Sequence, residues 1–217
     1  MLVATWAGLA LCLVGLVPSV AAAQVDALDA PRGYVRVDTN LKQNQFWLGG
    51  VLPVAQSFDL ISDLLLENRA LELDLGVGVH AGGLALFPTL GLSFDAGQRE
   101  FDRFVVPRLV TILDAGPLYL ESWVQLTLRD ALQKGNDDDF YTRDLLLIVP
   151  HQHLGVGLQT EWRWILQRHP GSNLINAAFG GNLSTRWDRS TFALFLGYDF
   201  AKLQRDVTGR FTFVQTF

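Results

Sequence analysis

Apolar and polar residues alternate along most of the chain that follows residue 24. The alternation is clearest in segment 71–80, which reads LELDLGVGVH, and it recurs in 118–129, 153–164 and 173–187. Successive side chains of a β-strand point to opposite faces, so each of these segments has one apolar and one polar face. A helical repeat would instead place the charged residues among the leucines. The pattern therefore predicts amphipathic strands.

Twelve such segments can be read along the chain. We predict strands at 33–40, 45–52, 57–66, 71–80, 83–95, 104–114, 118–129, 140–149, 153–164, 173–187, 191–200 and 208–217. The alternation is weakest in the first, second, sixth and eighth segments. Most segments have the roughly 9–11 residues that a tilted strand needs to cross a bilayer. The predicted fold class is all-β, a transmembrane antiparallel up-and-down barrel of about twelve strands, with ten strands as the alternative.

The connections between the predicted strands alternate in length. GQREFDR, ALQKGNDDD, LQRHPGS and AKLQRDV are long, whereas the intervening connections at 81–82, 115–117, 151–152 and 188–190 are short. Outer-membrane barrels have short periplasmic turns and longer extracellular loops, with both chain ends in the periplasm. A wrong strand count would disturb this rhythm, so the connections favour twelve strands over ten.

Composition agrees with a surface that faces lipid. Of the 217 residues, 49% are hydrophobic and only 18% are charged, whereas soluble domains carry charge on about a quarter of their residues. The length suits one domain. The formal net charge of −5 and the lack of a basic run exclude nucleic acid as a partner.

Residues 1–23 have the features of a cleaved secretory signal peptide. The segment contains no charged side chain, and its apolar run ends near Val17 before Pro18 and three alanines. The absence of Lys and Arg departs from the usual signal, and a membrane anchor is the alternative. We predict cleavage before Gln24, a short periplasmic segment at 24–32 and a barrel at 33–217. Cys12, the only cysteine, would be removed with the signal.

The final ten residues, TGRFTFVQTF, place Phe211, Phe213 and Phe217 on one face of a strand. This strand resembles the C-terminal strand of bacterial outer-membrane proteins, which ends in an aromatic residue. The resemblance implies a Gram-negative outer-membrane location, insertion by the barrel-assembly machinery through these three phenylalanines, and contact with lipopolysaccharide. The alternative is the last strand of a soluble β-sandwich.

The polar faces of the predicted strands carry many charged side chains that a closed barrel would turn into its lumen. The candidates for lining and selectivity are Asp59, Asp63, Glu67, Glu72, Asp74, Glu121, Arg129, Glu161, Arg163, Arg186 and Arg210. Acidic residues concentrate on 57–66 and 71–80, and arginines on 153–164, 173–187 and 208–217, so the two groups are expected to face each other across the lumen.

Two functions fit these charges. Opposed charged walls can orient a small polar solute at the constriction of a narrow channel. Alternatively, the charges form salt bridges that plug the lumen of a structural or assembly protein. Twelve-stranded relatives by architecture include oligogalacturonate porins, sialic-acid porins and nucleoside channels. The substrate-specific porins line the lumen with arginine tracks for acidic sugars, and the many carboxylates here depart from that pattern.

A lipid-modifying barrel enzyme is a weaker interpretation. Outer-membrane phospholipase A and lipid A deacylases pair a serine with a histidine. His80, His151, His153 and His169 do not occur in the HxS arrangement of those families. Neither the His151–His153 pair nor the acidic run 137–139 has a complete metal-ligand pattern. We therefore predict no catalytic residue, cofactor or metal.

Five tryptophans of the mature chain are expected near strand ends or on the apolar face, as the aromatic girdles of a membrane barrel require. They are Trp47, Trp123, Trp162, Trp164 and Trp187.

Overall fold

The chain folds into a closed antiparallel barrel. The computed structural model describes residues 32–40, 43–67, 70–95, 105–129, 137–166, 173–201 and 206–217. These residues form twelve strands: β1 (Arg32–Asn40), β2 (Asn44–Ala55), β3 (Phe58–Glu67), β4 (Ala70–Ala81), β5 (Leu84–Asp95), β6 (Val106–Ala115), β7 (Leu118–Thr127), β8 (Asp138–His151), β9 (Leu154–Leu166), β10 (Leu174–Trp187), β11 (Ser190–Asp199) and β12 (Asp206–Thr216). Each strand pairs with its sequence neighbours, and β1 pairs with β12. The predicted all-β, twelve-stranded barrel is confirmed, with strand ends that differ from the prediction by a few residues.

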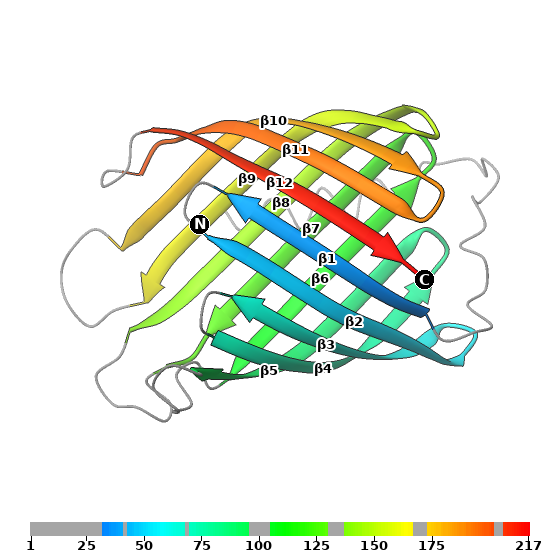
Figure 1. Ribbon diagram of the computed structural model, residues 1–217, viewed down its shortest axis with the longest axis horizontal. Coiled ribbons are helices and arrows are strands. Elements are labelled where there is room, and N and C mark those ends of the chain that lie inside the picture. The colour runs from blue at the N-terminus through cyan, green and yellow to red at the C-terminus, as the bar shows by residue number, and fades with distance from the viewer. Residues whose placement is uncertain are drawn as a thin grey trace.

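The barrel closes between its first and last strands. Figure 1 shows β12, in red, lying beside β1, in blue. Gly33 and Phe217 exchange both backbone hydrogen bonds, each 3.0 Å long. The Phe217 ring also covers Gly33, where an added Cβ would lie 2.3 Å from Cε2 of the ring. The terminal aromatic ring can therefore lie against position 33 only because this residue is glycine.

Two-residue turns connect the strands at the end of the barrel where β12 finishes, which we call the turn end (Figure 1). The turns lie at 56–57, 82–83, 116–117, 152–153 and 188–189. Gly82 and Gly116 have φ angles of 61° and 70°, which glycine adopts without the steric cost that a Cβ brings. The opposite end, the loop end, contains longer connections, such as the one between Asp95 and Val106.

The two faces of the wall differ in polarity. In β3 the burial pattern alternates strictly: Leu60 and Leu64 are exposed on the outer face, whereas Asp59 and Asp63 are buried in the lumen. Closure pairs the backbone groups of the strands and removes the unpaired edges that hydrocarbon would penalise. The interior of this barrel is consequently polar, and its exposed outer surface is apolar. In the described ranges, no helix is long and apolar enough to span a membrane.

Residues 1–31 lie outside the described part of the chain. The signal peptide, its cleavage before Gln24 and most of the segment 24–32 therefore remain predictions.

Candidate functional site

A buried arginine organises the middle of the lumen. Arg108 of β6 donates hydrogen bonds to Oε1 of Glu72 and to Oδ2 of Asp74, both at 2.5 Å. Its Nε group donates to Oε1 of Gln125 at 3.1 Å. The side chains of Arg108, Glu72 and Asp74 are at most 4% exposed. One guanidinium thus binds two carboxylates that would otherwise lie unpaired in a dry environment.

Two tryptophans flank this arginine. The guanidinium carbon of Arg108 lies 5.0 Å from the ring centroid of Trp47 and 5.0 Å from that of Trp123. The two rings are in edge contact, with centroids 5.4 Å apart. Our expectation for these two residues was wrong, because both lie on the lumen face of their strands. Trp162 and Trp164, which stack on each other, and Trp187 do face outward.

A second ionic group surrounds Trp123. Nη2 of Arg143 donates to Oε1 of Glu121 at 2.6 Å, and its guanidinium lies 5.2 Å from the Trp123 centroid. Arg36 lies 5.6 Å from the same centroid and donates to Asp38 at 2.7 Å. These contacts join β1, β7 and β8. We call Trp47, Trp123, Arg36, Arg108 and Arg143 the central layer.

Two further arginine–carboxylate groups lie toward the loop end. Arg129 and Arg163 both donate to Oδ2 of Asp139, each at 3.0 Å. Arg210 of β12 donates to Oε2 of Glu161 on β9 at 3.0 Å, which connects strands three places apart in the barrel.

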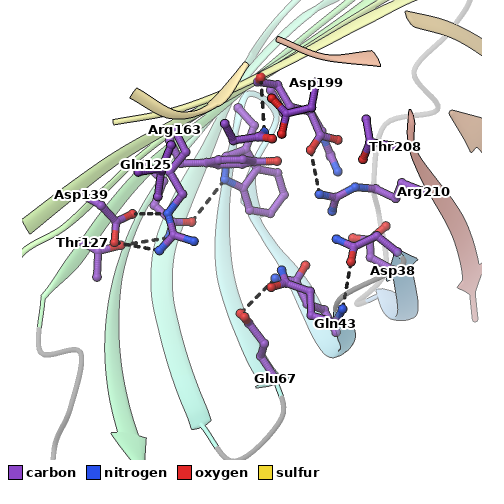
Figure 2. A pocket seen from close by; sticks show the side chains of 18 of the residues that line it. Asp38, Gln43, Glu67, Gln125, Thr127, Asp139, Arg163, Asp199, Thr208 and Arg210 are labelled. Atoms are coloured by element: carbon purple, nitrogen blue, oxygen red, sulfur yellow. Dashed lines mark hydrogen bonds and ion pairs between the residues drawn. The ribbon is translucent and has the colours of Figure 1, made fainter. Parts of the chain in front are cut away.

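A cavity of about 840 Å³ extends from the loop end to the central layer. Figure 2 shows Asp139 and Arg163 on one side of it, Asp38 and Arg210 on the other, and Asp199 between them. Its charged lining residues are Asp38, Glu67, Glu72, Arg129, Asp139, Arg143, Glu161, Arg163, Asp199, Asp206 and Arg210. We call this cavity the vestibule. The lining has seven carboxylates and four guanidinium groups, an excess of three negative charges.

Side chains fill the turn-end half of the lumen. Tyr34 donates to Oδ1 of Asp63 at 2.6 Å, and the ring of His80 forms a hydrogen bond with Asp59. Ile61 and Leu147 are buried there. None of these residues lines the vestibule.

The structure places the lumen candidates in four groups. Glu72 and Asp74 meet at Arg108, Glu121 meets Arg143, Arg129 and Arg163 share Asp139, and Glu161 meets Arg210. Glu67 accepts a hydrogen bond from Gln45 at 3.0 Å near the loop end. Asp59 and Asp63 lie in the turn-end half, and Arg186 is exposed near the turn after β10. Phe211, Phe213 and Phe217 share the outward face of the closing strand and its end.

Sequence reasoning missed Arg36, Asp38, Arg108, Asp139 and Arg143. All five lie on the first, sixth and eighth strands, where the alternation is weakest, or at the edge of a predicted loop. In β8 the face assignment was obscured because Asp144, a polar residue, occupies the outward face. The alternation gives no signal for Arg143, because Leu145 and Leu147 continue its lumen-facing side with apolar residues.

The described histidines and Asp138 contact neighbouring rings and backbone groups. The rings of His151 and His153 lie 5.3 Å apart, and His153 stacks on Trp187 at 5.1 Å. Asp138 accepts a hydrogen bond from the backbone N–H of Arg129. Within the described ranges, no three residues of the metal-ligating types come together. His169 lies outside those ranges.

Comparison with known proteins identifies the fold. No protein-family model matches the chain, and no curated protein sequence matches it. Among solved structures, it is similar to the COG4313 outer membrane channel from Pseudomonas putida F1, with 13% identity, a TM-score of 0.57, and coverage of 92% of this chain and 100% of that one. It is also similar to the NanC porin, with 8% identity, a TM-score of 0.52, and coverage of 86% and 98%. The KdgM porin matches at 10% identity and a TM-score of 0.50, with coverage of 86% and 98%. At these identities the likeness shows a porin-like membrane barrel fold.

Proposed function

We propose that this protein is a narrow outer-membrane channel for small polar solutes. The observation that carries the proposal is the vestibule, which opens toward the loop end and has a lining of ionisable and amide side chains. Its 840 Å³ can hold a small hydrated solute. In this account the loop end faces the cell exterior and is in contact with lipopolysaccharide, and the central layer is the constriction.

The charges of the vestibule favour cationic or zwitterionic solutes over polyanions. The three surplus carboxylates raise the local concentration of cations, because a low-dielectric wall focuses the field of lumen charges. The KdgM porin has been solved in complex with oligogalacturonate, a polyanion. A polyanion in this vestibule would meet more carboxylates than guanidinium groups. We therefore propose a different solute class for this protein.

A second candidate function is a non-conducting barrel with a plugged lumen. The observation that favours it is the paired and buried state of the ions. Arg108 contacts two carboxylates and two aromatic rings, and Ile61 and Leu147 are buried in the turn-end half. Such a protein would act through its loops or through a partner.

Planar-bilayer recording distinguishes the two functions. The purified barrel, shown to be folded by its heat-dependent shift on gels, is added to a bilayer in potassium chloride. A channel gives discrete current steps, and Trp47→Ala, which removes a bulky ring from the central layer, increases their size. Leu73→Ala on the outward face is the matched control and should leave the steps unchanged. Absence of steps from the folded wild type would refute the channel and support the plug.

A further inference from the structure

Among the described strand residues, the outer wall of the barrel contains one carboxylate away from the strand ends. Asp144 of β8 is exposed and lies on the same face as Phe140, Leu146 and Ile148. At the other outward positions of the described strand segments, away from their ends, the residues are apolar, glycine, serine or threonine. The strand arginines of the described segments all occupy lumen-facing positions. Among the residues that the structure describes, Asp144 therefore has no cation from a strand arginine on its own face of the wall.

Hydroxyl groups flank Asp144 on the neighbouring strands. Thr111, Ser122, Asp144 and Thr160 are successive cross-strand partners on β6, β7, β8 and β9. Ser122 donates to Oδ1 of Asp144 at 2.6 Å, and Thr160 donates to Oδ2 at 3.4 Å. We call these four residues the polar stripe. A carboxylate offers about four acceptor sites, so the two hydroxyls of the same wall leave part of its capacity unused.

The polar stripe crosses the part of the wall that faces hydrocarbon. Phe140 and Trp164, whose ring centroids are 5.6 Å apart, mark the aromatic zone toward the loop end. Asp144 lies four residues closer to the turn end on the same strand, which corresponds to about 10 Å along the membrane normal for a tilted strand. The apolar band of such barrels is about 25 Å tall. Asp144 is thus near the middle of the band.

The chemistry of the stripe fits a second copy of this chain. Ser122 and Thr160 already donate their single hydroxyl protons to Asp144 of the same chain, so the hydroxyl of Thr111 is the donor left for a second copy. Asp144 as acceptor and Thr111 as donor form a self-complementary set, which a two-fold symmetric interface requires because the same patch occurs on both sides. In hydrocarbon, polar groups find their partners within the protein or on another protein. Beside the stripe, Gly181 of β10 leaves a hollow, since an added Cβ would contact nothing within 4 Å. The hollow lets a neighbouring wall approach closely.

We propose that the wall formed by β6 to β10 is the interface of a homodimer, in which Asp144 of each copy accepts a hydrogen bond from Thr111 of the other. The interface excludes lipid from the carboxylate. It leaves the lumen of each barrel separate, so it does not depend on whether the lumen conducts.

Cysteine cross-linking in intact outer membranes tests this proposal. Cys12 is the only cysteine of the sequence, so Cys12→Ala gives a cysteine-free background. Leu146→Cys places a thiol beside Asp144, and Leu73→Cys places a matched thiol on β4; the two leucines are 43% and 46% exposed. We expect Leu146→Cys, treated with a short bismaleimide, to give a product of twice the monomer mass, and Leu73→Cys to give none.

Asp144→Leu supplies the second arm of the test. Leucine suits a lipid-facing position, so the variant should fold. A hydrogen bond to a charged group contributes on the order of tenfold to an association constant, and the Leu146→Cys dimer yield should fall by about that factor. An unchanged yield, equal cross-linking at positions 73 and 146, or no product at either position would overturn the proposal. A product of another mass would also overturn it and would indicate a different partner.

Discussion

Removing the guanidinium at position 108 should destabilise the barrel more than any other single change in the lumen. Arg108→Met leaves Glu72 and Asp74 without their cation, and these residues are 3% and 0% exposed. Loss of one partner of a buried ion pair costs about 3–5 kcal/mol because the remaining charge stays desolvated. The lost contacts with the two flanking tryptophans add to this cost, on the order of 1 kcal/mol or more. We expect the free energy of unfolding to fall by at least about 3 kcal/mol.

Equilibrium unfolding in lipid vesicles, followed by tryptophan fluorescence across a denaturant series, measures this change. The matched control combines Arg108→Met with Glu72→Gln and Asp74→Asn, which removes all three charges and should restore most of the lost stability. If Arg108→Met unfolds within about 0.5 kcal/mol of the wild type, as changes outside special sites do, the ionic centre is not structurally important. A control no more stable than the single variant would show that stranded charge is not the cause.

Three further predictions concern assembly, selectivity and processing. Deleting Phe217 should slow insertion into the outer membrane, because the ring and its backbone pairing with Gly33 close the barrel. The insertion rate is measured in a pulse-chase experiment as recovery of the heat-modifiable form, and an unchanged rate would contradict the prediction. Arg163→Ser should raise the cation preference in reversal-potential recordings, since it leaves Asp139 with one arginine fewer. Arg186→Ser, which lies outside the vestibule, should change the preference less. Equal shifts of the two variants would refute the assignment of Arg163 to the vestibule. Mass spectrometry of the protein extracted from membranes should find Gln24 as the first residue, and an uncleaved chain would contradict this.

The architecture could be predicted from sequence because one physical rule governs most strands. Lipid outside and polar groups inside impose a period of two. The burial of β3 alternates strictly, although Ile61 and Leu65 are among its lumen-facing residues, and β4 alternates over most of its length. Alternating connection lengths then favoured twelve strands. The predicted strand 140–149 is two residues short at each end of β8, and Asp144 interrupts the apolar outward face of this strand.

The internal pairing could not be predicted in the same way. Periodicity tells which face a side chain occupies, but the partner of a lumen residue depends on barrel closure and on side-chain reach. Acids and arginines were expected to face each other across the whole lumen. In the structure, Arg163 pairs with Asp139 on the adjacent strand, and Arg108 reaches Asp74 from two strands away. Trp47 and Trp123 were expected near strand ends or on the apolar face. Their lumen position could not be predicted, because a tryptophan ring packs equally well at a membrane interface and against a guanidinium group.

The most direct test of a narrow, cation-preferring channel is the reversal potential of the wild-type protein in a planar bilayer under a potassium chloride gradient. Dilute salt is needed, because the Debye length is about 30 Å at 0.01 M and only about 3 Å at 1 M, where lumen charges are screened. The excess of vestibule carboxylates predicts a measurable current, with a reversal potential of the sign for potassium over chloride. This reversal potential should move toward zero as both salt concentrations rise. No current from folded protein, or a reversal potential of the sign for chloride, would contradict the account.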